Sequence, residues 1–542
     1  MTEEERRAQR ARIAAIERKY NQTHLRNLAQ YQAEITRIFE DVAQEAARLG
    51  VTLDAPGGRM LSFNDLPAAK RRVNAMLKAM RKRLEAAVVN GIDAEWALAN
   101  GKNDAVVEQI AAAGLTKGDT KVYFNSHAAA LKAFKARKTA GIGLSRRVWN
   151  LTQQYKSELE MALDCGIRDG LSAQEMARQL KQYLNYPDKL FRRVRDEHGV
   201  LQLSKAAAAF HPGRGVYRSS HKNALRLAGT ETNIAYRTAD HERVQALDFV
   251  LGIKIVLSNN HTIRNSKGQR VPLTDICDEL AGSYPKGFKF TGWHPNCRCH
   301  TETILLSGAD FENFIKAKRE GRAYDITKAK GYVAEPPAAF KAWVKGNAGR
   351  IAAAAKAGTT PYFIKDNAVG YFLTDEMKSV RPAMFEVLSS DKMYKEVAFN
   401  PESYALKATH VGHNFDKNKG WYEKEVLNAG YKSGHSVILE KEDHSVMYQR
   451  NVEGMWDGKA FEIAAAESGS PNNIRNALKH CASKPNAKIA VIFSPKENLV
   501  KEAFHQGYAK YCGLKGTHQY RKFDQIYCIN LKGEVYITLK PE

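Results

Sequence analysis

The sequence predicts a multidomain protein with a mostly α-helical N-terminal body, a small α+β insert rich in Cys and His, and an α+β C-terminal domain. Apolar residues recur at spacings of three and four over much of the first 250 residues, which is typical of amphipathic helices. Three of the seven cysteines fall between Cys277 and Cys299, next to β-branched segments. Helix-like and strand-like segments alternate from Trp421 onward. A chain of 542 residues is also too long for one hydrophobic core.

These patterns divide the chain into five expected segments. They are a long helical region (1–115), a helical domain (116–250), the Cys/His insert with the helix that follows it (251–330), a connecting module (331–379) and the α+β C-terminal domain (380–542). Within the connecting module, we expect 334–367 to form two short helices. It should not be a free linker, because its aromatic residues offer a surface for docking on the rest of the protein.

The first helix carries a narrow apolar stripe from Ile13 to Val42, and we expect Gly50 to end it. About 45 helical residues span roughly 65–70 Å at ~1.5 Å per residue. Such a helix cannot bury its stripe within a compact domain of its own. We therefore expect it to pack on a partner helix or subunit, and its stripe to find no partner within its own sequence.

Further helices follow from capping and periodicity. Asn64, Asp65 and Pro67 predict a helix start, and Gly91 is the expected stop. The other expected helices of the body are Leu144–Leu163, Ser172–Leu184 with Ser172 as the N-cap, and Ser219–Leu247.

The insert begins near Gly252 with the predicted strand Ile253–Leu257 and ends with the strand candidate Thr301–Leu305. Between them, Cys277, His294, Cys297 and Cys299 offer the sulfur and imidazole ligands of one structural tetrahedral zinc site. His261 or His300 can replace one ligand. The alternative is that these residues only stabilise a hairpin by packing and hydrogen bonding.

Charge points toward polyanions. The formal net charge is +24, and residues 117–248 hold 23 Lys and Arg against 13 Asp and Glu. Such a surface favours nucleic acid, either DNA inside a capsid or RNA; the alternative is a well-solvated basic surface. No apolar run approaches the ~20 residues of a membrane helix, and Met1–Leu49 is charged throughout. We therefore expect a protein made in the cytoplasm, without a membrane segment.

The run Trp293-His294-Pro295-Asn296-Cys297-Arg298-Cys299 resembles the closing signature of the phage Mu F-like family of minor head proteins. The preceding helix, with Thr230 and Glu231, is similar to that family's arginine-threonine-glutamate helix, although Gly229 stands where the family has arginine. The resemblance covers roughly residues 145–306. It implies a virion protein at the portal or inner head surface, needed for head morphogenesis and in contact with portal and capsid proteins.

In the C-terminal domain we expect a helix from Trp421 to Ala429 closed by Gly430, and a helix that starts at Pro495 behind Ser494. The other expected elements are the strands Val437–Leu439, Val446–Gln449, Lys459–Ile463 and Ile489–Phe493, a helix capped by Ser470 or Asn472 that runs through His480, and a final hairpin of Gln525–Ile529 with Val535–Leu539.

This order resembles the tRNA nuclease domains at the ends of contact-dependent inhibition toxins, which belong to the barnase, EndoU and colicin group. The resemblance rests on order and spacing over about 120 residues, carried by Ala429-Gly430-Tyr431, Asp457–Ile463 and Asn473–Leu478. It implies a metal-independent ribonuclease effector, an RNA substrate and an immunity protein as partner.

Metal-free RNA cleavage needs a base, an acid and cations that hold the phosphate. The candidate residues for these roles are His410, His413, Lys459, Glu462 and Arg475. A rival is a metal-dependent nuclease with Asp457 and Glu462 as its acids, although Ala464 occupies its lysine position. Two further alternatives are a purely structural virion protein whose C-terminal domain is a binding module, and an ADP-ribosyltransferase, for which the sequence shows no convincing motif series.

Overall fold

The computed structural model divides the chain into two compact units, which we describe separately. The first comprises residues 1–274 and 290–332, and the second comprises 275–289 and 333–542. The structure describes all residues except 1–2, 55, 58, 113–114, 116, 140, 188, 190–191, 196, 204–208, 211, 213–215, 259–261, 265–268, 273, 296, 323, 416–419, 442–451, 496–498, 516–519 and 542. The expected strand Val446–Gln449 and the candidate ligand His261 lie outside the described residues.

The first unit is mostly helical. Its helices are α1 (Glu3–Gly50), α2 (Pro67–Ala111), α3 (Lys117–Thr120), α4 (Ala128–Ala136), α5 (Leu144–Arg168), α6 (Ala173–Asn185), α9 (Ser220–Ala246) and α11 (Gly308–Arg319), with 3-10 turns η1 (Phe63–Asp65), η2 (Lys121–Tyr123) and η3 (Ile326–Lys328). Its strands are β1 (Arg192–Arg195), β2 (Leu201–Leu203), β3 (Val250–Val256), β4 (Thr262–Arg264), β5 (Arg270–Pro272) and β7 (His300–Leu305).

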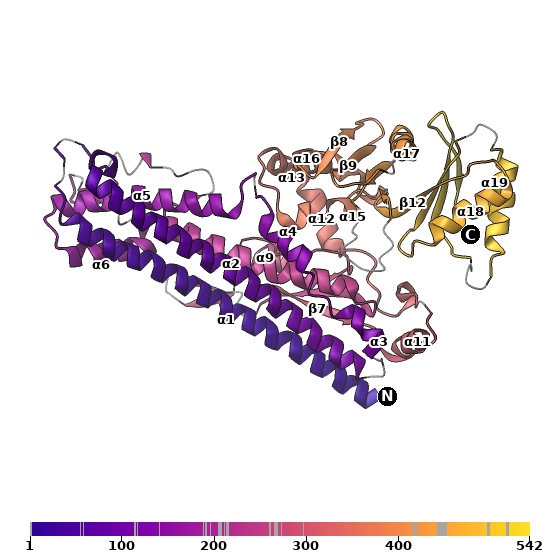
Figure 1. The fold of residues 1–542 in the computed structure, drawn as a ribbon, viewed down its shortest axis with the longest axis horizontal. Coiled ribbons are helices and arrows are strands. Elements are labelled where there is room, and N and C mark those ends of the chain that lie inside the picture. The colour runs from indigo at the N-terminus through magenta and orange to yellow at the C-terminus, as the bar shows by residue number, and fades with distance from the viewer. Residues whose placement is uncertain are drawn as a thin grey trace. The chain divides into compact units, whose positions relative to one another are not determined.

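The long first helix is confirmed, but the expectation that its stripe has no partner in its own chain is wrong. Helix α1 lies against α2, α6 and α9 within the first unit (Figure 1). Ile35, Ile38 and Val42 are buried in the same hydrophobic core as residues of α2, α5 and α9. Helices α2, α6 and α9, which come from separate parts of the sequence, thus cover the apolar stripe of α1 together.

Gly91 does not end a helix, because α2 continues through it to Ala111. A Cβ atom at this position would lie 2.7 Å from Thr232 Cγ2 and 3.5 Å from the ring of Tyr31. The glycine therefore allows α9 and α1 to approach α2 closely, and its role is in packing rather than termination.

The expected helix starts at Ser172 and Ser219 are confirmed. Ser172 accepts a hydrogen bond from the backbone of Glu175, whose carboxylate bonds back to Ser172, so that the two form a capping box. Ser219 caps α9 by accepting from Lys222. In the insert, strands β3 and β7 pair antiparallel, with Val256 opposite His300.

The second unit contains the C-terminal sheet and the segments before it. Its helices are α10 (Ile276–Leu280), α12 (Ala338–Gly346), α13 (Ala348–Lys356), α14 (Tyr362–Lys365), α15 (Ala368–Tyr371), α16 (Arg381–Ser390), α17 (Gly420–Lys432), α18 (Pro471–Ala482) and α19 (Lys501–Cys512), with η4 (Asp375–Val380). Its strands are β6 (Gly282–Tyr284), β8 (Tyr394–Phe399), β9 (Leu406–His410), β10 (Ser436–Leu439), β11 (Gly454–Trp456), β12 (Lys459–Ala465), β13 (Ile489–Phe493), β14 (Gln525–Ile529) and β15 (Val535–Leu539).

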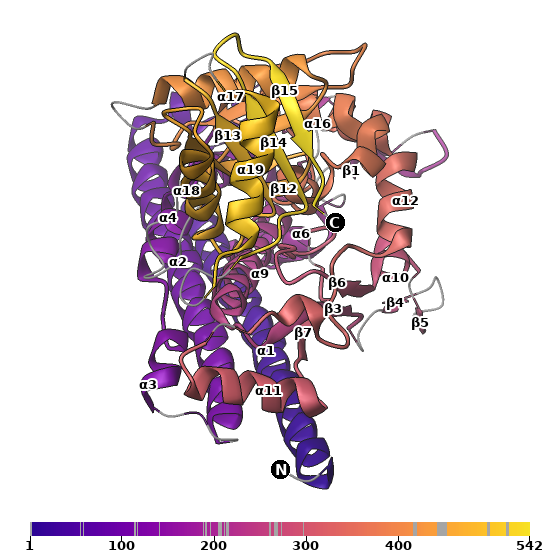
Figure 2. The same ribbon diagram turned by 90° about the vertical axis from the view of Figure 1, so that its right-hand side faces the viewer.

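Strands β8 to β15 form one mixed sheet in which spatial order follows chain order. The pairs β9–β10, β12–β13 and β13–β14 are parallel, and the other neighbouring pairs are antiparallel. Helix α17 packs its apolar residues on one face, whereas α18 and α19 pack theirs on the other. Figure 2 shows α18 and α19 in front of the sheet.

The segment expected as a connecting module forms α12 to α15 and belongs to the same compact unit as the sheet. Helix α13 lies against α16, and α16 lies against β8 and β9. The buried Arg381 at the start of α16 donates hydrogen bonds to the carbonyls of Leu373 and Tyr404 and pairs with Asp457 at 3.1 Å. Residue 380, where the boundary is expected, ends η4 directly before α16 and lies within this one unit.

Two expected helix ends in this unit are wrong. Gly430 lies inside α17, where a Cβ atom would come within 2.5 Å of Val437 Cγ2 and 2.7 Å of Trp456 Cη2. Its role is close packing of α17 on the sheet. Helix α19 begins at Lys501 rather than Pro495, with Val500 in an extended conformation at its N-cap. The caps at Ser470 and the final hairpin are confirmed.

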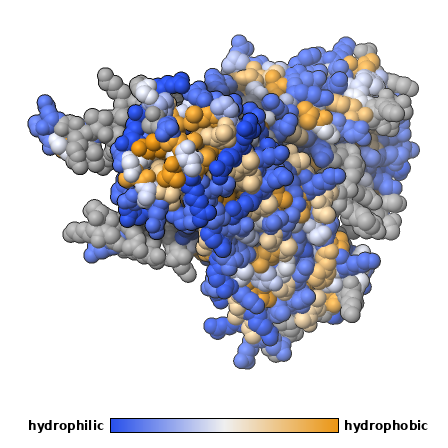
Figure 3. Space-filling model, turned by 60° about the vertical axis from the view of Figure 1, so that its left-hand side comes forward, coloured by the Kyte–Doolittle hydropathy of each residue, from blue (hydrophilic) through white to orange (hydrophobic). Residues whose placement is uncertain are grey.

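Within the part of the chain that the structure describes, no helix is long and apolar enough to span a membrane. The face shown in Figure 3 is mostly hydrophilic, and its apolar residues lie in separate patches.

Candidate functional site

The strongest cluster of ionisable side chains in the second unit lies where strands β9 and β10 end. His410 is the last residue of β9, and Glu440 directly follows β10, its parallel neighbour. Carboxyl ends of parallel strands are common places for binding sites in α/β sheets. Tyr394, on β8, pairs with His410 across the sheet and donates its hydroxyl to Glu440 Oε1 at 3.0 Å.

His413 lies three residues beyond β9 and joins the cluster from the loop. Its ring nitrogens lie 2.7 Å from the carbonyl oxygen of Glu440 (Nδ1) and 3.1 Å from Glu423 Oε2 on α17 (Nε2). Glu453 Oε2 lies 3.9 Å from the same Nε2. The side chain of His413 is fully buried. Strand ends, a loop and a helix thus bring one tyrosine, two histidines and three glutamates together.

Burial and neighbouring charges move the pKa values of this cluster in different directions. Burial raises the pKa of Glu440 to about 7 and also raises that of Tyr394. Burial and Lys441 lower the pKa of His410. Burial also opposes the charged form of His413, but its bonds to Glu423 and Glu440 and the nearby Glu453 raise its pKa. Groups with such divergent pKa values are candidates for proton transfer.

The other three candidate residues of the C-terminal domain lie elsewhere. Glu462 is buried on β12 and faces His480 Nε2 at 3.3 Å and Lys484 Nζ at 3.6 Å. Lys459 pairs with Asp524 at 2.8 Å. Arg475 on α18 donates to Asn476 at 3.0 Å. None of the bonds described for these three residues joins them to His410 or His413.

Asp457, an acid of the rival metal-dependent nuclease, is held by other groups. Its carboxylate pairs with Arg381 and with His435 Nδ1 at 2.6 Å, and it accepts a hydrogen bond from the backbone of Ser436. Sequence reasoning missed Tyr394, Glu423, Glu440 and Glu453, because they come from four separate segments.

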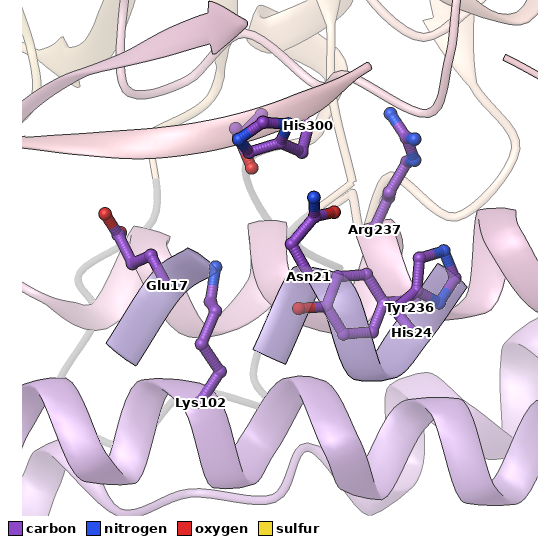
Figure 4. Close-up of a pocket in the computed structure, with 8 residues that line it drawn as sticks. Glu17, Asn21, His24, Lys102, Tyr236, Arg237 and His300 are labelled. Carbon is purple, nitrogen blue, oxygen red and sulfur yellow. The ribbon is translucent and has the colours of Figure 1, made fainter. Parts of the chain in front are cut away.

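The first unit holds a buried polar pocket between α1, α2, α9 and β7 (Figure 4). Glu17, Asn21 and His24 reach it from α1, and Lys102 points from α2 toward the strand that carries His300. The remaining lining residues are Tyr236, Arg237 and Thr301. The cavity measures about 10 Å³, which is the size of a single water molecule and too small for a substrate.

Two close polar pairs lie beside this pocket. Lys102 Nζ lies 2.5 Å from Asp240 Oδ1, which also accepts from Asn103 at 2.8 Å. His24 Nδ1 lies 2.5 Å from Glu95 Oε2. Burial would raise the pKa of Asp240, but Lys102 and the hydrogen bonds lower it below its ordinary value. Burial, Arg237 and Lys102 lower the pKa of His300 to about 4, so it is neutral at pH 7.

The pocket adjoins the Trp293–Cys299 run. Asn233 and Arg237 on α9 both donate to the carbonyl oxygen of Cys297 at 3.3 Å. The guanidinium of Arg237 lies 4.9 Å from the centre of the Phe290 ring. Side chains of helix α9 therefore hold the loop at Cys297 by its backbone carbonyl.

Glu231 on α9 has cationic partners although Gly229 provides none. Its carboxylate binds Arg137 at 2.6 Å and Arg147 at 2.7 Å. Arginines that precede Glu231 by more than 80 positions thus supply the charge that a local arginine would provide.

The candidate zinc ligands are divided between the two units. His294, Cys297 and the buried Cys299 belong to the first unit, and the buried Cys277 belongs to the second. His300 lines the polar pocket of the first unit.

A comparison with protein-family models, curated proteins and solved structures gave no match for the chain.

Proposed function

We propose that this chain is a phage minor head protein, located at the portal or inner head surface of the virion, with a C-terminal domain that acts as a ribonuclease-like effector. The head assignment rests on the Trp293–Cys299 run and the helix α9 that precedes it. The bonds from Asn233 and Arg237 to the Cys297 carbonyl support it, because they give this motif a structural role. Portal and capsid proteins would be its partners, and its net charge of +24 suits contact with phage DNA.

The ribonuclease assignment rests on the histidine cluster at the ends of β9 and β10. The backbone N–H of Gly412 donates to His410 Nδ1 at 3.0 Å, which orients the ring and leaves Nε2 for proton exchange with a substrate. Glu440, held by Tyr394, is the second group that can transfer a proton. Cleavage next to a 2′-hydroxyl needs two such groups.

Cations near this cluster can hold an RNA phosphate. Lys441 follows Glu440 directly and lies near His410. Lys395 and Lys424 lie against the ring of Phe415, which contacts His413. Because these lysines carry the contact with the phosphate backbone, cleavage should weaken as salt rises.

The test is RNA cleavage by the purified full chain, with and without a chelator. His410→Ala should lower the rate by ~10²–10⁴-fold, the usual contribution of a proton-transfer group. His505→Ala, which removes an exposed histidine on α19, is the matched control and should cleave like the wild type. If the folded wild-type chain is inert on RNA, the C-terminal domain is a binding module of a structural virion protein.

We further propose that the chain binds a structural zinc ion through ligands drawn from Cys277, His294, Cys297 and Cys299, whose thiols and imidazole are typical zinc ligands. Purified full chain should then retain about one zinc per chain under reducing conditions, and Cys297→Ser should lower both zinc content and melting temperature. Cys512→Ser, at an exposed position, is the control. Protein that carries no zinc under these conditions would contradict the proposal.

A further inference from the structure

His413 has a hydrogen-bonding arrangement that fixes where its protons lie. Its Nδ1 lies 2.7 Å from the carbonyl oxygen of Glu440, and a carbonyl oxygen can only accept a hydrogen bond. Nδ1 therefore carries a proton. In the neutral ring the other nitrogen, Nε2, then presents a lone pair.

That lone pair faces carboxylates. Glu423 Oε2 lies 3.1 Å from Nε2, and Glu453 Oε2 lies 3.9 Å from it. A lone pair on nitrogen and a carboxylate oxygen repel each other at such distances. Either a second proton on Nε2 or a metal ion between the three atoms removes the repulsion.

The three ligand groups are largely shielded from water. The side chain of His413 is fully buried, that of Glu423 is 7% exposed and that of Glu453 is 17% exposed. A metal ion among them would bind the Nε2 lone pair and both carboxylates at once, whereas a proton on Nε2 serves the carboxylate at 3.1 Å and leaves the other at 3.9 Å.

The ligand geometry agrees with this. The ligand atoms of His413, Glu423 and Glu453 all lie within 4.8 Å of one another. Ligands bonded to one metal ion at ~2.0–2.2 Å are about 3–3.5 Å apart, and the distances of 3.1 Å and 3.9 Å from His413 Nε2 to the two carboxylates are close to this range. Histidine ligands of metals usually donate their other N–H to a carbonyl or carboxylate, as His413 does to Glu440.

We propose that His413 Nε2, Glu423 and Glu453 bind a divalent first-row transition-metal ion. One imidazole with two carboxylates suits Mn²⁺ or Zn²⁺ better than the oxygen-only preference of Mg²⁺ and Ca²⁺. Three protein ligands leave coordination positions for water or a phosphate oxygen. The site does not depend on the ribonuclease proposal, and it is separate from the cysteine-containing group.

The test uses Mn²⁺ as the probe, because thiolate-containing groups bind it poorly and because its free form gives a strong electron paramagnetic resonance signal. Chelator-treated full chain is titrated with Mn²⁺. We expect about one bound ion per chain, and affinity at least tenfold weaker in Glu423→Gln and Glu453→Gln. Glu425→Gln, the same change two residues further along α17, is the matched control and should bind like the wild type.

Thermal unfolding of each variant verifies that the variant is folded. If one of the two glutamine variants does not fold, His413→Ala takes its place. Absence of Mn²⁺ binding, or equal binding by Glu423→Gln, Glu453→Gln and the control, overturns the proposal and leaves His413 as an imidazolium. RNA cleavage is measured on the same samples. Metal binding without cleavage refutes the ribonuclease alone, and cleavage without metal binding refutes the metal site alone.

Discussion

The two compact units use buried polar side chains in different ways. In the helical unit, Lys102 and Asp240 form an ion pair deep between long helices, and the buried His24 lies 2.5 Å from Glu95 Oε2. In the sheet unit, the buried Arg381 pairs with Asp457, and a second group of polar side chains gathers where β9 and β10 end. There one imidazole faces the carboxylates of Glu423 and Glu453.

This contrast separates a structural use of charge from a chemical one. Matched buried pairs fix how helices pack, because a shifted helix would leave a charge without its partner. A cluster of carboxylates and imidazoles whose pKa values are shifted in different directions suits proton transfer or the binding of a cation. The sheet unit depends instead on close apolar packing, as Gly430 shows.

The largest expected stability effect is in the helical unit. Lys102→Met removes the cation that lies 2.5 Å from the buried Asp240 and should lower the free energy of unfolding by about 3–5 kcal/mol. Urea unfolding followed by circular dichroism measures this. Arg83→Ala, which breaks the exposed pair with Asp41, should cost less than about 1 kcal/mol. If Lys102→Met and Arg83→Ala lowered the free energy of unfolding equally, the buried pair would have no special structural role.

A second prediction concerns Glu158, which accepts hydrogen bonds from Ser220 and Gln154 in the helical unit. Burial raises its pKa to about 8. The folded state holds the Glu158 proton more tightly than the unfolded state does. The contribution of protonated Glu158 to stability is therefore complete below about pH 4.3 and is lost as the pH rises through 8. Between these pH values, the free energy of unfolding of Glu158→Gln should rise relative to that of the wild type by up to about 1.4 kcal/mol per pH unit. Urea unfolding at pH 5 and pH 8 checks it, and a pH-independent difference would contradict it.

The smallest expected effect tests the sheet unit. Gly430→Ala places a methyl group against Val437 and Trp456 and should cost about 1–3 kcal/mol. Gly349→Ala, in helix α13 with no atom within 4 Å of the added methyl, should be neutral or stabilising by up to about 1 kcal/mol. The melting temperatures of the two variants, compared with that of the wild type, measure these effects. An unchanged melting temperature for Gly430→Ala would show that the packing of α17 on the sheet is looser than the distances indicate.

Capping and periodicity predicted most helices of the body, because those signals are local. Ser172 and Ser219 cap helices as expected, and α1 ends at Gly50. Gly91 and Gly430 misled the prediction, since a glycine that admits a neighbouring element has the same local sequence signal as one that ends a helix. Strands β8, β9 and β11 were not predicted; β8 is partly exposed, and β11 has only three residues.

The candidate site was predicted only where its residues are close in the sequence. His410 and His413 are three residues apart, and the end of β9 brings them together. Glu423, Glu440 and Glu453 join them through α17, β10 and the start of β11, and only the pairing of strands brings these segments together. Lys459, Glu462 and Arg475 were grouped with the histidines by residue type and by the resemblance to nuclease domains, and the bonds described for them lead to other partners.

The order of strands in the sheet has a consequence for synthesis on the ribosome. Each strand from β8 to β15 lies beside its neighbours in the chain, so each can pair as soon as it emerges. The helical unit cannot proceed in this way, because Glu17 on α1 bonds to Thr303 on β7, 286 residues later. At ~5–20 residues per second, α1 waits roughly 15–60 seconds for this partner. During that time Glu17 lacks this hydrogen-bond partner, whereas the apolar stripe of α1 can pack on α2, α6 and α9 as each of these helices emerges.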